Sequence, residues 1–142
     1  MKTVKQLLDT KQVRIISVTE NTSVLDALKV MTEKNISALL VMEGSELLGI
    51  FTERDYARKL ILQGKSSKDT LIKEAMTADP ITINLADTID KCMEIMTEKH
   101  IRHLPIVVNA EVKGMISIGD LVKFIIEDQK QTISQLESYI SG

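Results

Sequence analysis

Two short segments of the chain combine a hydroxyl group and a carboxylate at the same spacing. Thr52 precedes Asp55 by three residues, and Ser117 precedes Asp120 by three residues, 65 positions further on. Each hydroxyl follows an apolar run and stands where a helix is expected to begin. This spacing fits a capping box, in which hydroxyl and acid satisfy the free N–H groups of a helix start. It also suits nucleotide binding, because a helix N-terminus favours an anion and a carboxylate can accept hydrogen bonds from two ribose hydroxyls. The spacing alone leaves both interpretations open.

Both segments belong to an internal repeat. Residues 31–34, Met-Thr-Glu-Lys, return as residues 96–99, and the offset of 65 holds without a gap from about residue 16 to residue 61. A repeat of this kind sets the architecture of the whole fold. In each copy, apolar side chains at i, i+3, i+4 and i+7 indicate a helix after a short opening strand, which we place at residues 14–18 in the first copy. Thr22 and Asp87 are the predicted N-caps of these helices.

Two strands and a second helix complete each copy. The predicted hairpins are residues 38–42 with 47–51 and residues 103–108 with 112–116, each closed by a short turn. A helix follows each hairpin, and the polar residues 63–67 form the linker between copies. We therefore predict an α+β fold of two tandem β-α-β-β-α repeats around one shared core. Residues 1–66 are repeat 1, residues 67–127 are repeat 2 and residues 128–142 are a C-terminal helical extension.

The segments that flank the repeats carry two further signals. Residues 4–8 resemble residues 72–76, but at an offset of 68, so the first copy holds three extra residues before its opening strand. At the other end, an apolar stripe on the last helix must be covered by the chain itself or by a second subunit. The stripe comprises Phe124, Ile125, Thr132, Ile133, Leu136 and Ile140.

The composition argues against several classes of function. A net charge of −2 gives no general field for nucleic acid. The longest apolar runs are too short to span a membrane, and no signal peptide is visible, so we predict a cytoplasmic protein without nucleic-acid or membrane partners. Cys92 is the single cysteine, which leaves no disulfide and no cysteine metal cluster. With two histidines, His100 and His103, there is neither a nucleophile–base pair nor metal-ligand spacing. We predict no catalytic residue, no metal and no enzyme activity.

With these features in register, the chain resembles a tandem pair of CBS domains, a module that senses adenosine-containing ligands. The resemblance covers about residues 4–124. It rests on the repeat order, on residues 37–41 and 102–107, and on the two Gly-x-x-Thr/Ser-x-x-Asp segments that begin at Gly49 and Gly114.

The resemblance implies two clefts, each lined by both copies. In the first, Ser117 and Asp120 would hold ribose and phosphate. The other residues implied for that cleft are Ile16, Ser37 and Ala38 beside the base, with Arg102 and His103 as phosphate contacts. In the second cleft, Thr52 and Asp55 would take the corresponding role. The other residues implied there are Arg54, Ile81, His103, Leu104 and Pro105.

The family resemblance also limits the ligands and partners. AMP, ADP or ATP is the expected ligand, with NAD(H) and S-adenosylmethionine as alternatives that share the ribose. A homodimer acting on an unknown regulated protein is the expected assembly, and a scaffold that has lost its ligand is the rival hypothesis. The copies differ at Ser37-Ala38 against Arg102-His103, at Leu40 against Pro105 and at Arg54 against Gly119. These differences predict that the two clefts are unequal.

Overall fold

One amphipathic helix of 11 residues anchors each copy of the repeat. In the computed structural model, which describes residues 1–141, these helices are α2 (Val24–Lys34) and α5 (Ile89–Lys99). Their buried positions match across the repeat: Val24 with Ile89, Ala27 with Cys92, and Met31 with Met96. The helical pattern is therefore confirmed in both copies.

The N-caps of these helices lie one residue after the predicted positions. The Ser23 hydroxyl accepts a hydrogen bond from the Asp26 N–H at 3.1 Å, and the Thr88 hydroxyl accepts one from the Lys91 N–H at 3.1 Å. The prediction of Thr22 and Asp87 is wrong because both side chains have other partners. The Thr22 hydroxyl lies 3.2 Å from that of Thr19, and the Asp87 carboxylate accepts from the Asn84 N–H at 2.7 Å.

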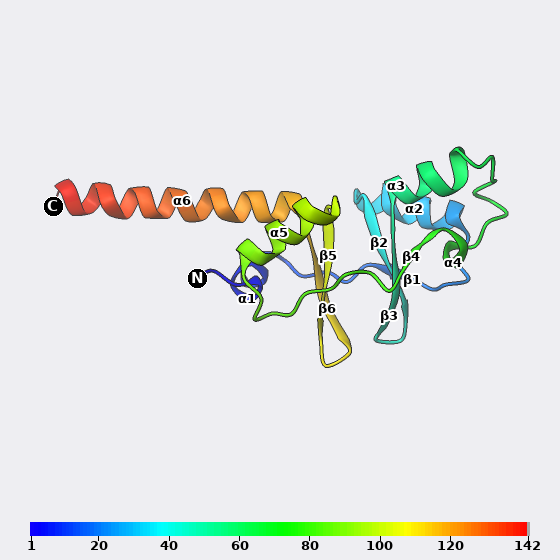
Figure 1. Cartoon of the computed structure of the whole chain (residues 1–142), viewed down its shortest axis with the longest axis horizontal. Helices are drawn as coiled ribbons and strands as arrows, with labels where there is room; N and C mark the ends of the chain where they lie inside the picture. The colour runs from blue at the N-terminus through cyan, green and yellow to red at the C-terminus, as the bar shows by residue number, and fades with distance from the viewer. Residues whose placement is uncertain (142) are drawn as a thin grey trace.

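The strands form two small sheets that stand side by side (Figure 1). The first contains β1 (Ser17–Val18), β2 (Ala38–Glu43), β3 (Glu46–Thr52) and β4 (Thr77–Ala78), in that order. β1 is parallel to β2, and the other neighbours are antiparallel. The second sheet is the hairpin of β5 (His103–Val108) and β6 (Glu111–Ser117). Both predicted hairpins are confirmed, but the predicted opening strand at 14–18 shortens to two residues. Its counterpart in the second copy is a single bridge between Ile83 and Ile106.

Each spatial unit is completed by a helix from the other copy. α1 (Val4–Asp9) buries Val4 and Leu7 among the core residues of the second copy, whereas α4 (Ile72–Ala75) lies against the first. Backbone hydrogen bonds fix this exchange, from the Val4 N–H to the Asp87 carbonyl at 2.8 Å and from the Ile72 N–H to the Thr22 carbonyl at 2.7 Å. Figure 1 shows α1 beside α5 and β5, far from the strands that follow it in the sequence.

The interior consists of two main apolar clusters rather than the one shared core predicted. The first cluster surrounds Phe51 and the second surrounds Leu104, and each contains side chains from both copies because of the exchanged helices. A third, small cluster of Leu40, Met42 and Val112 lies between the two sheets. Each unit thus has its own apolar core, and the small third cluster joins the two units.

The helices that follow the hairpins differ in length. In the first copy, α3 (Glu53–Tyr56) runs into a π-helical turn, η1 (Ala57–Ile61), which buries Leu60. In the second, α6 (Ile118–Ser141) continues for 24 residues and projects well beyond the two units (Figure 1). Among residues 1–141, no helix is long and apolar enough to cross a membrane.

The close approach of β3 to β4 requires glycine at position 49. A Cβ atom there would lie 2.7 Å from the Met76 sulfur and 2.8 Å from the Thr77 carbonyl oxygen. We therefore expect Gly49→Ala to lower the free energy of unfolding by about 1–3 kcal/mol, because the backbone of β4 must move. Gly119→Ala is the control, since the nearest atom to its Cβ would be the Ser117 hydroxyl at 3.6 Å. Urea denaturation measures both variants, and equal stability of Gly49→Ala and the wild type would contradict the prediction.

Candidate functional site

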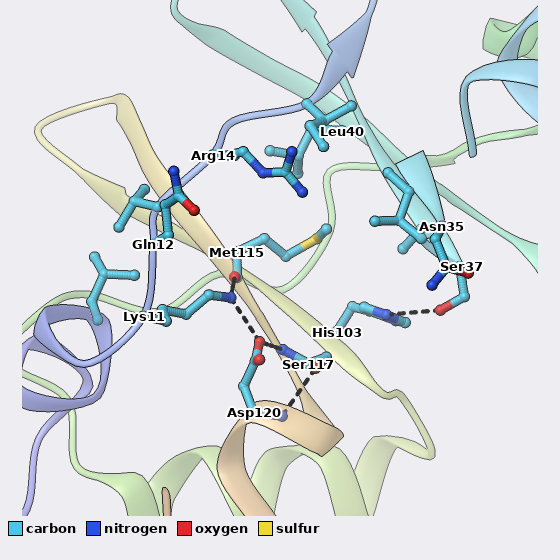
Figure 2. A pocket seen from close by; sticks show the side chains of 15 residues that line it. Lys11, Gln12, Arg14, Asn35, Ser37, Leu40, His103, Met115, Ser117 and Asp120 are labelled. Carbon is cyan, nitrogen blue, oxygen red and sulfur yellow. Dashed lines mark hydrogen bonds and ion pairs between the residues drawn. The ribbon is translucent and has the colours of Figure 1, made fainter. Parts of the chain in front are cut away.

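Two clefts open where the two units meet. Cleft A has a volume of about 350 Å³ and cleft B about 480 Å³, within the range of small-molecule sites. Cleft A is lined by Leu8, residues 11–14, Ile16, residues 35–38 and Leu40 from the first copy, and by His103, Met115, Ser117 and Asp120 from the second (Figure 2). Cleft B is lined by Ile50, Thr52, Arg54, Asp55, Arg58 and Lys59, and from the second copy by Thr77, residues 79–81, Lys99 and residues 101–103.

Most of the residues proposed for the first cleft lie together in cleft A. These are Ile16, Ser37, Ala38, His103, Ser117 and Asp120. Arg102 is the exception and lines cleft B instead. The resemblance placed it with His103 in the first cleft, but Arg102 precedes β5 and lies with Lys99 and Ile101 on the side of cleft B.

The residues proposed for the second cleft divide in the same way. Thr52, Arg54, Asp55, Ile81 and His103 line cleft B. Leu104 and Pro105 do not line it, because Leu104 is fully buried in the second cluster and Pro105 is buried within β5. The Pro105 carbonyl is also occupied, since it accepts a hydrogen bond from the Ile83 N–H at 3.0 Å.

Asp120 lies at the start of α6 with its carboxylate in cleft A (Figure 2). Its Oδ2 accepts hydrogen bonds from the Ser117 N–H and from the Lys11 ammonium, each at 2.8 Å. Partial burial raises the pKa of Asp120, but the Lys11 ammonium and the Ser117 N–H lower it by more, so the net shift is downward. The carboxylate is therefore ionised at neutral pH.

Asp55 takes the equivalent place at the start of α3 but is more enclosed, at 8% exposed. Its Oδ2 accepts from the Thr52 N–H at 2.9 Å, and its N–H donates to the Thr52 hydroxyl at 3.3 Å, which completes a capping box. Its Oδ1 accepts from the Thr77 hydroxyl at 3.0 Å and lies 3.4 Å from the Lys59 ammonium. The capping interpretation of this segment is thus confirmed.

His103 lines both clefts and touches the other copy. Its Nε2 lies 3.3 Å from the hydroxyl of Ser37 across the junction (Figure 2). Burial lowers the pKa of His103; nearby Arg102 lowers it further, while Asp120 and Glu53 oppose the shift. The imidazole is therefore mostly neutral at pH 7.

The charge of both clefts favours an anion. In cleft B, Asp55 and Asp79 face five cationic side chains, Arg54, Arg58, Lys59, Lys99 and Arg102. In cleft A, Asp120 faces Lys11 and Arg14. Sequence reasoning did not select Lys11 or Arg14 as functional residues. The change of offset from 68 to 65 could have identified them, because it places the extra residues of the first copy between residue 8 and the opening strand.

Other groups capable of chemistry lie outside the clefts or apart from one another. Cys92 is fully buried in the second cluster, where burial raises the pKa of its thiol to about 11. Among residues 1–141, the structure contains no group of three or more His, Cys, Asp or Glu side chains arranged to hold a metal ion.

Comparison with known proteins identifies the family. The model of the CBS domain matches residues 4–62 and 72–127, so the chain belongs to the CBS-domain family and contains a tandem pair. It is 40% identical over 129 residues to CBSX3, a mitochondrial CBS domain-containing protein of Arabidopsis thaliana, covering 87% of this chain and 63% of that one. Another Arabidopsis thaliana protein, CBSCBSPB2, is 33% identical over 82% of this chain, which spans only 22% of its length.

Solved structures share the fold. A CBS-domain protein of Burkholderia ambifaria MC40-6 is 49% identical, with a TM-score of 0.86 over 90% of this chain and 96% of that one. CBSX2, whose crystal structure is a complex with AMP, has a TM-score of 0.75 over 89% of this chain and 98% of its own. At 20% identity, the second likeness concerns the fold alone.

The environment of His103 predicts a pH dependence of stability. A histidine with a lowered pKa in the folded state takes up its proton more readily in the unfolded chain. Protonation therefore favours the unfolded chain. The free energy of unfolding is highest above the ordinary pKa of histidine, about 6.5, and decreases as the pH falls below that value. We expect this decrease in urea denaturation of the wild type and its absence in His103→Asn. His100→Asn, which copies Asn35 of the first repeat, is the control and retains the decrease. If His103→Asn loses stability over the same window as the wild type, another group is responsible.

Proposed function

We propose that this chain is a regulatory module that binds adenosine-containing nucleotides between its two CBS repeats without catalysing a reaction. The observation that carries the proposal is the content of the two clefts. Each combines a carboxylate at a helix start with cationic side chains and an isoleucine, Ile16 in cleft A and Ile81 in cleft B. The cationic side chains and the isoleucines match the phosphates and the base of a nucleotide, and the more exposed of the two carboxylates, that of Asp120, matches the ribose.

AMP, ADP and ATP are the ligands best supported by this chemistry. The phosphates suit the net positive charge of both clefts, and aliphatic side chains with backbone groups suit an adenine ring in a chain with 3% aromatic residues. NAD(H) and S-adenosylmethionine share the ribose and are the alternatives. CBSX2 was crystallised with AMP, which makes AMP the first probe. A cytoplasmic location stays a prediction, since CBSX3 is mitochondrial.

Binding becomes regulation only if the ligand favours one arrangement of the molecule over another. Both clefts lie at the junction of the two units, whose remaining apolar contact is the small third cluster. A nucleotide that contacts both copies would therefore change how the units pack. We propose that the regulated protein responds to that change.

Thermal unfolding with AMP, ADP, ATP, NAD, NADH and S-adenosylmethionine tests the binding proposal. A ligand present at about 100 times its dissociation constant is expected to stabilise the fold by about 2.7 kcal/mol. Guanosine monophosphate is the control for adenine. If no adenosine compound raises the unfolding temperature at millimolar concentration, the scaffold hypothesis replaces the sensor.

We also propose that the chain forms a homodimer through α6. Phe124 and Ile125 of the predicted stripe pack partly against the second cluster, but the rest of the helix has an exposed seam. Its residues are spaced alternately by four and three: Val122, Ile126, Gln129, Ile133, Leu136 and Ile140. One heptad position repeats isoleucine, and the other holds valine, glutamine and leucine, a pattern that suits a two-stranded coiled coil with one polar position.

Light scattering after size exclusion tests the dimer. Ile133→Glu places a charge in the seam and is expected to raise the dimer dissociation constant by at least about tenfold, because burying an unpaired charge costs more than 1.4 kcal/mol. Gln131→Glu, on the opposite face of the same helix, is the control and keeps the dimer. A wild-type chain that is monomeric at tens of micromolar would contradict the proposal.

A further inference from the structure

We infer that the two clefts have divided their roles: cleft A alone binds the nucleoside, and Lys11 changes partner from Asp120 to the phosphate of the ligand. This inference rests on the proposed function and assigns it to one of the two sites. It also selects among ligands, because it requires a phosphate.

The two equivalent acids differ in the oxygen atoms they can offer. Oδ2 of Asp120 accepts from Ser117 and Lys11, whereas no hydrogen bond within residues 1–141 reaches its Oδ1. The side chain is 30% exposed and lies in cleft A (Figure 2). Asp120 can therefore accept a hydrogen bond from a ribose hydroxyl without losing its role as a helix cap.

Both carboxylate oxygens of Asp55 already accept hydrogen bonds within the protein. Its Oδ2 is occupied by Thr52, and its Oδ1 accepts from the Thr77 hydroxyl with the Lys59 ammonium nearby. Thr77 lies on β4, so this carboxylate connects the start of α3 to the edge strand of the first sheet. A ribose in cleft B would have to displace these donors from a carboxylate whose side chain is 11% exposed. Asp55 therefore serves the fold rather than a ligand.

Lys11 gives cleft A its selectivity. Its ammonium donates to Asp120 at 2.8 Å and to the Met115 carbonyl at 3.2 Å, and it comes from the segment that is three residues longer in the first copy. One ribose hydroxyl can use Oδ1 of Asp120, but a second hydroxyl of the same ribose must share Oδ2 with this ammonium. A flexible lysine can turn to a phosphate of the same ligand, with Arg14 beside it in the cleft.

This exchange of partners predicts which ligands bind. Adenosine would displace the ammonium from Asp120 and offer it no anion in return. S-adenosylmethionine carries a sulfonium and an ammonium against one carboxylate, so Lys11 and Arg14 repel its net positive charge. A phosphorylated nucleotide satisfies both Asp120 and Lys11, so AMP is expected to bind at least about tenfold more tightly than adenosine or S-adenosylmethionine.

Isothermal titration of the whole protein tests the choice of cleft. The wild type is expected to bind one AMP per chain, Asp120→Asn to weaken AMP by at least about tenfold, and Asp55→Asn to keep the stoichiometry and affinity while unfolding more easily. If Asp55→Asn does not fold, amide chemical shifts of the wild type during AMP titration give the same answer. Shifts at residues 117–120 support the inference, and shifts centred on residues 52–55 overturn it.

The role of Lys11 has a separate test. Lys11→Met is expected to bring the AMP and adenosine affinities to within about threefold of each other, whereas Lys5→Met, on the exposed face of α1, leaves the preference unchanged. An unchanged preference in Lys11→Met, or two AMP molecules per chain, would overturn the inference. Binding of adenosine compounds in cleft B would overturn it while leaving the proposed function intact. If no adenosine compound binds at all, the proposed function itself fails.

Discussion

The exchange of α1 and α4 between the two units is the constraint on which the other features depend. Neither unit is complete without a segment from the other copy, because α1 fills the second cluster and α4 fills the first. The backbone bonds at Val4 and Ile72 make this exchange part of the hydrogen-bonded fold rather than a side-chain contact. The chain must then cross the junction between the units twice, and each crossing forms one wall of a cleft.

Those two crossings explain why equivalent acids have different surroundings. The segment after α4 enters the first sheet as β4, which brings the Thr77 hydroxyl onto Asp55. The segment after α1 is longer and passes cleft A without joining the sheet until Ser17, so a lysine side chain rather than a strand reaches Asp120. The Thr77 hydroxyl is held in place by a strand, whereas the Lys11 ammonium ends a flexible side chain. A ligand would therefore displace the lysine from Asp120 more easily than the threonine from Asp55. The asymmetry of the clefts therefore follows from the length of a connection.

The capping box and the binding site use the same atoms, and the structure shows how both roles can coexist. A helix start needs one oxygen of the acid, which leaves the second for another partner. In the first repeat that partner is the fold itself, through Thr77. In the second repeat, the other oxygen faces the cleft. The sequence motif alone therefore predicts a helix cap and does not say whether the acid also binds a ligand.

The sequence by itself determined the duplicated architecture, both hairpins, the buried faces of α2 and α5, and a minority of the residues that line each cleft, the two carboxylates among them. These features follow from local periodicity and from comparing the two copies, which are both properties of the chain order. Only the tertiary structure decided the exchange of α1 and α4, the two separate cores, the side of the chain on which Arg102 lies, and the partner of each acid. Those outcomes depend on contacts between residues more than 20 positions apart, such as Lys11 with Asp120 and Thr77 with Asp55. Neither pair has a spacing that the repeat reproduces in the other copy.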